Sequence, residues 1–228
     1  MTIAQRRAAL WRSGGGPSIV TEGLALHLNA RLPQSYPGTG ITWANIAGGG
    51  YDFYMFNASK WLNEQGGLML WDNQNWLNVS GNAISQNAFT IEYWLKPASL
   101  VNFNQVLRVG TSNGTEFVWH STIDGAIYCG PVSGGRFDVV QSNIYQVGVF
   151  GHQVYTYNNG AASYYKNGQL LAQKSMGAIS APLQSFTAFR SSENGFDGEM
   201  ALFRVYSGKA LTGAEVAQNY LVDVDLIL

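Results

Sequence analysis

The acidic residues are the first side chains to examine for chemistry, because glycoside hydrolysis needs two carboxylates facing one bond about 5 to 9 Å apart. No expected strand of this chain carries two acids in alternation. Glu92 stands alone between Ile91 and Tyr93, and Asp197 with Glu199 falls at a glycine-flanked turn. We interpret Glu92 as a strand residue whose carboxylate reaches solvent or a backbone group. The sequence therefore predicts no catalytic residue and no enzyme activity.

Metal ligands are equally sparse. Calcium takes six to eight oxygens, usually from several carboxylates and carbonyls within one or two loops, whereas the aspartates considered stand singly at Asp52, Asp72, Asp124, Asp138 and Asp197. The three histidines, His27, His120 and His152, have no cysteine or acidic partner at the spacing of a zinc site. We expect no cofactor and no metal centre, and leave open only a calcium site that uses backbone carbonyls.

Aromatic residues offer a different chemistry, because an exposed ring can stack on the face of a sugar. Tryptophan more often fills cores and interfaces, and Trp94 is predicted to do so. In the loop-rich stretch 51–76 we leave both uses open, with subunit contact favoured over glycan contact. The candidates there are Tyr51, Trp61, Trp71 and Trp76.

A basic arm precedes the rest of the chain. Residues 1–20 contain Arg6, Arg7, Trp11 and Arg12, followed by the flexible break Gly14–Pro17. Arginine and tryptophan are enriched at the centres of protein interfaces, so we predict that these four residues dock on a partner subunit. The alternative is a solvated terminus, which is common at chain ends.

Composition indicates one domain with a low-charge surface, here residues 21–228. Of the 228 residues 46% are apolar and only 12% charged, with 27 glycines and a net charge of -1. A nearly neutral chain has no broad basic field, so nucleic acid and anionic membrane are excluded as expected partners. We expect no signal peptide or anchor, because no apolar run reaches the roughly 18 residues of a membrane span. The lone Cys129 cannot form an internal disulfide, which suits synthesis in a reducing cytoplasm.

Turn dipeptides divide the chain into strand-length runs. Asn113-Gly114 separates 105–109 from 116–120, and Asn159-Gly160 and Asn167-Gly168 enclose 162–166 in the same way. These dipeptides tolerate the positive φ of two-residue hairpin turns. The pattern predicts an antiparallel, all-β meander.

The C-terminal region departs from this pattern. Thr212 and Glu215 have the spacing of a capping box, with Leu211 and Val216 placed to form a hydrophobic staple. We predict one short helix that reaches Tyr220. The alternating and then apolar residues 222–228 are interpreted as a final strand.

Several segments, read in order, resemble a known family. They are 23–30, 35–40, 43–48, 89–97, 165–170 and 197–206 with the helix that follows. Together they resemble the laminin-G-like, concanavalin A-like lectin/glucanase domains of tailed-bacteriophage virion proteins and bacterial surface proteins. One departure is 145–150, where the family usually has a tryptophan at the start of a late strand.

The resemblance implies a two-sheet antiparallel β-sandwich of the concanavalin-like jelly-roll type, with an N-terminal arm and a short C-terminal helix. It also implies a structural virion protein of a tailed bacteriophage, a capsid decoration or fibre/tail component docked through the arm. The expected partners are other virion proteins and further copies of the chain, and the expected location is the virion. The alternative is a lectin-like module that binds a host or surface glycan.

Overall fold

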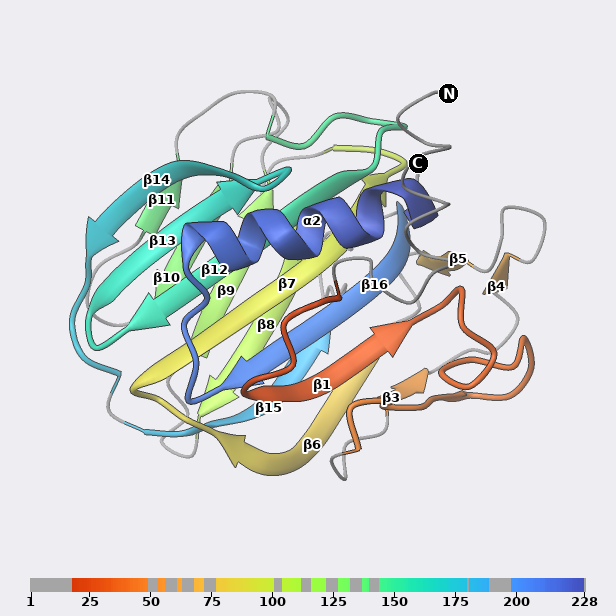
Figure 1. Ribbon diagram of the computed structural model, residues 1–228, viewed down its shortest axis with the longest axis horizontal. Helices are drawn as coiled ribbons and strands as arrows, with labels where there is room; N and C mark the ends of the chain where they lie inside the picture. Colours follow the sequence, from red (N-terminus) through yellow and green to blue (C-terminus); the bar gives the residue numbers. More distant parts are fainter. Residues whose placement is uncertain are drawn as a thin grey trace.

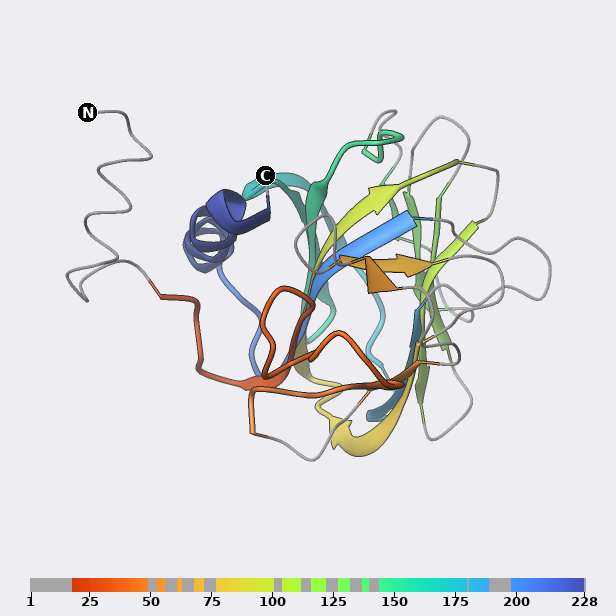
Figure 2. The same cartoon turned by 90° about the vertical axis from the view of Figure 1, so that its right-hand side faces the viewer.

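The computed structural model shows two antiparallel β-sheets packed face to face, with a helix on the outside of one of them (Figure 2). This confirms the predicted fold class. The structure describes residues 18–48, 53–55, 61–62, 68–71, 77–100, 104–111, 116–121, 127–131, 137–139, 144–179, 181–188 and 198–227.

The first sheet, called sheet A, has the long strand β7 (Ala88–Pro97) near its centre, between β12 and β16. Its order in the described residues is β14 (Gln169–Ser175), β13 (Ala161–Lys166), β12 (Gly151–Asn158), β7, β16 (Gly198–Ser207), β5 (Leu68–Trp71) and β4 (Trp61–Leu62). The strand β1 (Leu24–Asn29) pairs with the second half of β16, beyond the residues that pair with β5.

The second sheet, called sheet B, covers the inner face of sheet A. Its order in the described part of the chain is β11 (Phe137–Val139), β10 (Ile127–Pro131), β9 (Glu116–Ser121), β8 (Asn104–Thr111), β15 (Leu183–Ala188), β6 (Leu77–Ile84), β3 (Phe53–Met55) and β2 (Thr42–Trp43). The core between the sheets includes Ile91 and Tyr93 from sheet A and Leu107, Val109 and Leu183 from sheet B.

The turns on either side of β13 follow the prediction from the dipeptides. Asn159 and Gly160 have φ values of 45° and 93°, and Asn167 and Gly168 have values of 50° and 77°. Two consecutive residues with positive φ form the turn whose twist matches that of the flanking strands. A Cβ on Gly168 would lie 3.2 Å from Tyr220, so this glycine also allows close approach to the helix.

The helix α2 (Gly213–Ile227) begins where the capping box was predicted. Thr212 N donates to Glu215 Oε2 at 2.7 Å, and Glu215 N donates to Thr212 Oγ1 at 3.3 Å. The helix crosses the outer face of sheet A above β7, β12 and β16 (Figure 1). No helix in the described ranges is long and apolar enough to span a membrane.

The prediction of a final strand at 222–228 is wrong, because α2 continues to Ile227 and is longer than expected. The helical period of 3.6 residues places Asn219, Asp223 and Ile227 on one buried face. The alternating Val and Asp residues at 222–225 would suit a strand with its aspartates facing solvent. In the structure Asp223 is buried, so that interpretation fails. At the C-terminal end, Arg31 Nη2 donates to the Ile227 carbonyl at 3.2 Å.

The last residues of the arm are attached to the same helix. Gln218 Nε2 donates to the Ser18 carbonyl at 2.6 Å, and Val20 N donates to Asn219 Oδ1 at 2.9 Å. Tyr206 Oη donates to the Val20 carbonyl at 3.1 Å. The base of the arm is therefore held beside α2.

Candidate functional site

The predicted site residues are mostly beyond the part of the chain that the structure describes. Arg6, Arg7, Trp11 and Arg12 of the arm lie outside it, as do Tyr51 and Trp76. Trp61 and Trp71 belong to the neighbouring strands β4 and β5, where Trp61 is opposite Met69 and Trp71 is opposite Gly198. Trp94 is fully buried, which confirms its structural role.

Between sheet A and α2 lies a cluster of buried polar side chains, called here the helix-anchoring cluster: Glu92, His152, Arg204, Tyr206, Asn219 and Asp223. Alternation along β7 explains its position. Phe89, Ile91, Tyr93 and Leu95 face sheet B, so Glu92 faces α2. Because the helix covers this face, these polar groups are buried and must find partners among themselves.

Glu92 has no exposed surface, so the expectation that its carboxylate reaches solvent or backbone is wrong. Its Oε1 accepts from His152 Nε2 at 2.7 Å, and its Oε2 accepts from Asn219 Nδ2 at 2.9 Å. No local pattern indicated this contact, because 60 residues separate Glu92 from His152. Asn219 also donates to Tyr206 Oη at 2.8 Å.

Arg204 joins the two carboxylates of the cluster. Its Nη1 and Nη2 donate to Asp223 Oδ2 and Oδ1 at 2.6 and 2.8 Å, a bidentate pair, and Nη1 lies 3.4 Å from Glu92 Oε2. Glu92 and Arg204 are opposite each other on β7 and β16. One guanidinium thus connects the centre of the sheet to α2.

The charges of the cluster support each other. Burial alone would raise the pKa of Glu92, but Arg204 and the hydrogen bonds from His152 and Asn219 hold that pKa at about 2. Burial favours the neutral form of Arg204, yet Asp223 and Glu92 raise its pKa above the ordinary value. His27, opposite Arg204 on β1, has its pKa lowered to about 3 by burial and by Arg204.

An aromatic group adjoins the cluster. The Trp94 ring stacks on Tyr220 of α2 with centroids 5.6 Å apart, and the His152 ring lies 5.2 Å from Trp94. Together with the bidentate pair, these contacts attach the helix to the sheet. The cluster is closed to solvent, and its geometry is that of a structural anchor.

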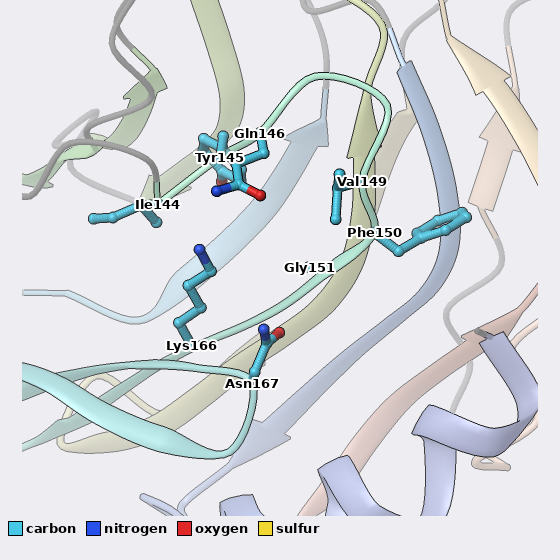
Figure 3. A pocket seen from close by; sticks show the side chains of 8 residues that line it. All are labelled: Ile144, Tyr145, Gln146, Val149, Phe150, Gly151, Lys166 and Asn167. Carbon is cyan, nitrogen blue, oxygen red and sulfur yellow. The ribbon is translucent and has the colours of Figure 1, made fainter.

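A small pocket opens beside this cluster, where β12 begins and β13 ends (Figure 3). We call it the edge pocket; its volume is about 50 Å³. It is lined by Ile144, Tyr145, Gln146, Val149, Phe150, Gly151, Lys166 and Asn167. The Lys166 side chain extends from β13 toward the segment that carries Ile144, Tyr145 and Gln146, whereas Phe150 points away from it (Figure 3).

Three polar side chains come together at this pocket. Gln146 is exposed, and its side-chain amide makes no hydrogen bond with the part of the chain that the structure describes. Asn167 Oδ1 accepts from His152 N at 3.0 Å, so the NH₂ group of Asn167 remains for another partner. Lys166 supplies an ammonium group, and Val149 contributes an apolar wall that is 50% exposed.

Neither the helix-anchoring cluster nor the edge pocket has the ligands of a metal centre. Within the described residues, no three His, Cys, Asp or Glu side chains are grouped to hold a metal ion. The eight residues around the edge pocket include no carboxylate.

Gln146, Lys166 and Asn167 were not predicted as site residues from the sequence. Asn167 was noticed only as a turn former, and 145–150 only as a departure from a family pattern. The departure from the family pattern at 145–150 could have indicated the pocket, because the segment 144–150 contains no strand and supplies several of the lining residues.

A two-sheet antiparallel sandwich with these connections defines the jelly-roll class of β-proteins, and sequence comparison agrees. The model of the concanavalin A-like lectin/glucanases superfamily matches residues 72–217, so the chain belongs to this family. No curated protein gives a significant sequence match to the chain.

Solved structures share the fold at low sequence identity. Domain 4 of AbnA, a GH43 extracellular arabinanase from Geobacillus stearothermophilus, in complex with arabinotriose, is 16% identical with a TM-score of 0.65; the match covers 86% of this chain and 98% of that one. Trypanosoma rangeli sialidase is 13% identical with a TM-score of 0.65, covering 99% and 39%.

A third similar structure is of botulinum neurotoxin type C, whose cell entry depends upon interaction with two ganglioside molecules. It is 11% identical with a TM-score of 0.66, and the match covers 89% of this chain and 52% of that one. This chain therefore spans about half of the toxin chain and less than half of the sialidase chain.

Proposed function

We propose that this domain is a carbohydrate-binding module without catalytic activity, and that the edge pocket is its sugar contact. The observation that carries the proposal is the convergence of Gln146, Lys166 and Asn167 on one pocket with an apolar wall. Small-molecule sites combine apolar walls with a few convergent polar groups that fix orientation. Amide groups both donate and accept hydrogen bonds, as sugar hydroxyls do.

The family and its structural neighbours support a sugar ligand. The matched family contains lectins and glucanases by its own description. One neighbour is domain 4 of an arabinanase, in complex with arabinotriose, and another is the toxin whose cell entry depends on gangliosides. Because a shared fold does not imply a shared activity, the proposal rests on the pocket first.

The positions of the carboxylates in the described part of the chain support the proposed lack of catalysis. A hydrolase needs one acid to protonate the leaving group and a second to attack or activate water. Glu92 and Asp223 are both bound to Arg204 beneath α2, where neither can reach a sugar at the surface. No carboxylate lines the edge pocket.

Saturation-transfer NMR with a glycan panel tests the proposal, using a pair of matched variants. Asn167→Asp keeps the Oδ1 acceptor and a side chain that tolerates positive φ, but removes the NH₂ donor. Asn159→Asp makes the same change at the other turn of β13, where φ is 45°. We expect Asn167→Asp and Gln146→Ala to weaken the signal and Asn159→Asp to leave it unchanged. A panel with no bound glycan, with or without calcium, would contradict the proposal.

A structural role in a tailed-phage virion is the second candidate. Its support is the resemblance of the ordered family segments to domains of tailed-bacteriophage virion proteins, together with the contacts that hold Ser18 and Val20 beside α2. A fixed base would give the arm a defined direction toward a capsid or tail subunit. The two functions are compatible, because a decoration domain can also bind sugar.

Deleting residues 1–17 tests the attachment while retaining the Ser18 and Val20 contacts with α2. We expect the truncated protein to fold but to be lost from purified particles. Undiminished incorporation would refute docking through the arm.

A further inference from the structure

The edge pocket contains more hydrogen-bond donors than acceptors. An ammonium group has three donors and no acceptor, so Lys166 can bind a ligand in addition to its contacts within the protein. The carbonyl oxygen of Asn167 is already used by His152 N, which leaves the NH₂ donor. With Gln146 as the flexible third group, the pocket suits a ligand that only accepts hydrogen bonds.

The charged residues around the pocket also favour a ligand that accepts hydrogen bonds. Lys96, which lies over the Phe150 ring at 5.2 Å, is neutralised by Glu199 at 2.6 Å. Lys166 is therefore the cation that lines the pocket, and no lining residue is acidic. Partial burial lowers the pKa of Lys166, and an anion placed beside its ammonium group would raise that pKa again.

The size of the pocket limits what can enter. One water molecule needs about 10–15 Å³ of such space, so about 50 Å³ admits a group of a few heavy atoms. A whole sugar ring does not fit, but one substituent does, with the ring resting on Val149, which lines the pocket and is 50% exposed.

We propose that the edge pocket binds the carboxylate of an acidic sugar, with Lys166 as the charge partner and the Asn167 NH₂ group as a second donor. The proposal rests on the carbohydrate-binding function proposed above and names its ligand class. A planar carboxylate has two acceptor oxygens, which matches two donors on adjacent residues. A tetrahedral sulfate ester is bulkier and fits the small volume less well.

Pairs of ligands that differ only in the acid provide the test. The probes are methyl glucuronide with methyl glucoside, methyl galacturonide with methyl galactoside, and sialyllactose with lactose, plus the 6-sulfates of the two neutral glycosides. We expect the acid in at least one pair to bind wild-type protein about tenfold more tightly than its neutral partner, as for a charge-assisted hydrogen bond.

Three variants separate the pocket from net charge. Lys166→Met removes the ammonium group at similar length and should abolish the preference for the acid, while Lys166→Arg should keep most of it. Lys174→Met removes one charge from exposed β14 and should change nothing. If Lys166→Met does not fold, Asn167→Asp, which adds a negative charge at the rim, should reverse the preference.

The outcomes distinguish the two proposals. Equal binding of acid and neutral partners would overturn the carboxylate assignment and leave carbohydrate binding intact. Tighter binding of the sulfates than of the acids would overturn it as well. If Lys166→Met keeps the preference for the acid, the carboxylate binds outside the edge pocket and the assignment is wrong. If no sugar binds at all, both proposals are rejected.

Discussion

Arg204 and Lys166 are the cations of two neighbouring regions of sheet A, and their surroundings differ. Arg204 has 1% side-chain exposure and two carboxylate partners, whereas Lys166 faces a pocket whose lining has none. The regions meet at His152, whose ring contacts Glu92 and whose backbone N–H bonds Asn167. In the helix-anchoring cluster, carboxylates on β7 and α2 surround the cation, whereas the residues that line the edge pocket include no carboxylate. Substitutions should therefore affect stability in the first region and binding in the second.

The largest expected effect is on stability, from Arg204→Met. Removing the guanidinium leaves Glu92 and Asp223 buried without their charge partner, which costs about 3–5 kcal/mol in comparable buried pairs. Urea unfolding would measure the loss. Lys209 also joins two carboxylates, Glu22 and Glu215, but near the surface, so Lys209→Met is the matched control and should change little.

A triple variant sharpens this result. Adding Glu92→Gln and Asp223→Asn to Arg204→Met removes the two unpaired charges, so most of the lost stability should return. If the triple variant is no more stable than the single one, lost packing and not unpaired charge explains the effect.

The second expected effect is a loss of stability in acid. The unfolded chain protonates His27 near pH 6.5 but the folded chain only near pH 3, so stability falls as pH drops through this window, by up to about 1.4 kcal/mol per pH unit for one proton. Glu92 adds a similar slope between pH 4.5 and 2. Urea unfolding at a series of pH values would show both slopes.

His27→Gln separates the two contributions, because glutamine does not titrate. We expect the slope between pH 6.5 and 4.5 to flatten in this variant and the slope between pH 4.5 and 3 to fall to the contribution of Glu92, while the slope below pH 3 stays. An unchanged profile would mean that His27 does not resist protonation in the folded chain.

A smaller effect is expected at the start of α2. Thr212→Ala removes the oxygen that accepts from Glu215 N, and loss of such a cap costs about 1 kcal/mol. Thr39→Ala, at an exposed position, is the control. A loss as large as that of Arg204→Met would mean that the helix depends on its N-terminal cap as much as on the helix-anchoring cluster.

The smallest effect on stability is expected at the edge pocket. Gln146 is exposed, so Gln146→Ala should change the free energy of unfolding by less than about 0.5 kcal/mol. The same variant should weaken glycan binding in NMR titration. Loss of both stability and binding would remove the distinction between the two regions.

Local patterns predicted much of the fold. Asn159-Gly160 and Asn167-Gly168 form the predicted turns, and Thr212 with Glu215 forms the predicted cap. These predictions succeed because a turn or a cap is decided by residues a few positions apart. The order of the strands in each sheet was not predicted, and the two-sheet arrangement was an expectation from the family resemblance.

Long-range contacts explain the errors. Glu92 looked like a strand residue near solvent because Asn219, which binds it, lies 127 residues away. The end of α2 looked like a strand because Asp223 can face a sheet only when Arg204 neutralises it. In both cases the helix changes the environment of the sheet face beneath it.

By itself, the sequence determined the antiparallel all-β character of the chain, the hairpins around β13 and the start of the helix, because each depends on neighbouring residues. Only the tertiary structure decided how far α2 extends, which carboxylates are buried, and that Gln146 meets Lys166 and Asn167 at one pocket. The physical reason is burial. A charged side chain takes its role from the partners that surround it once water is removed, and those partners come from distant parts of the chain.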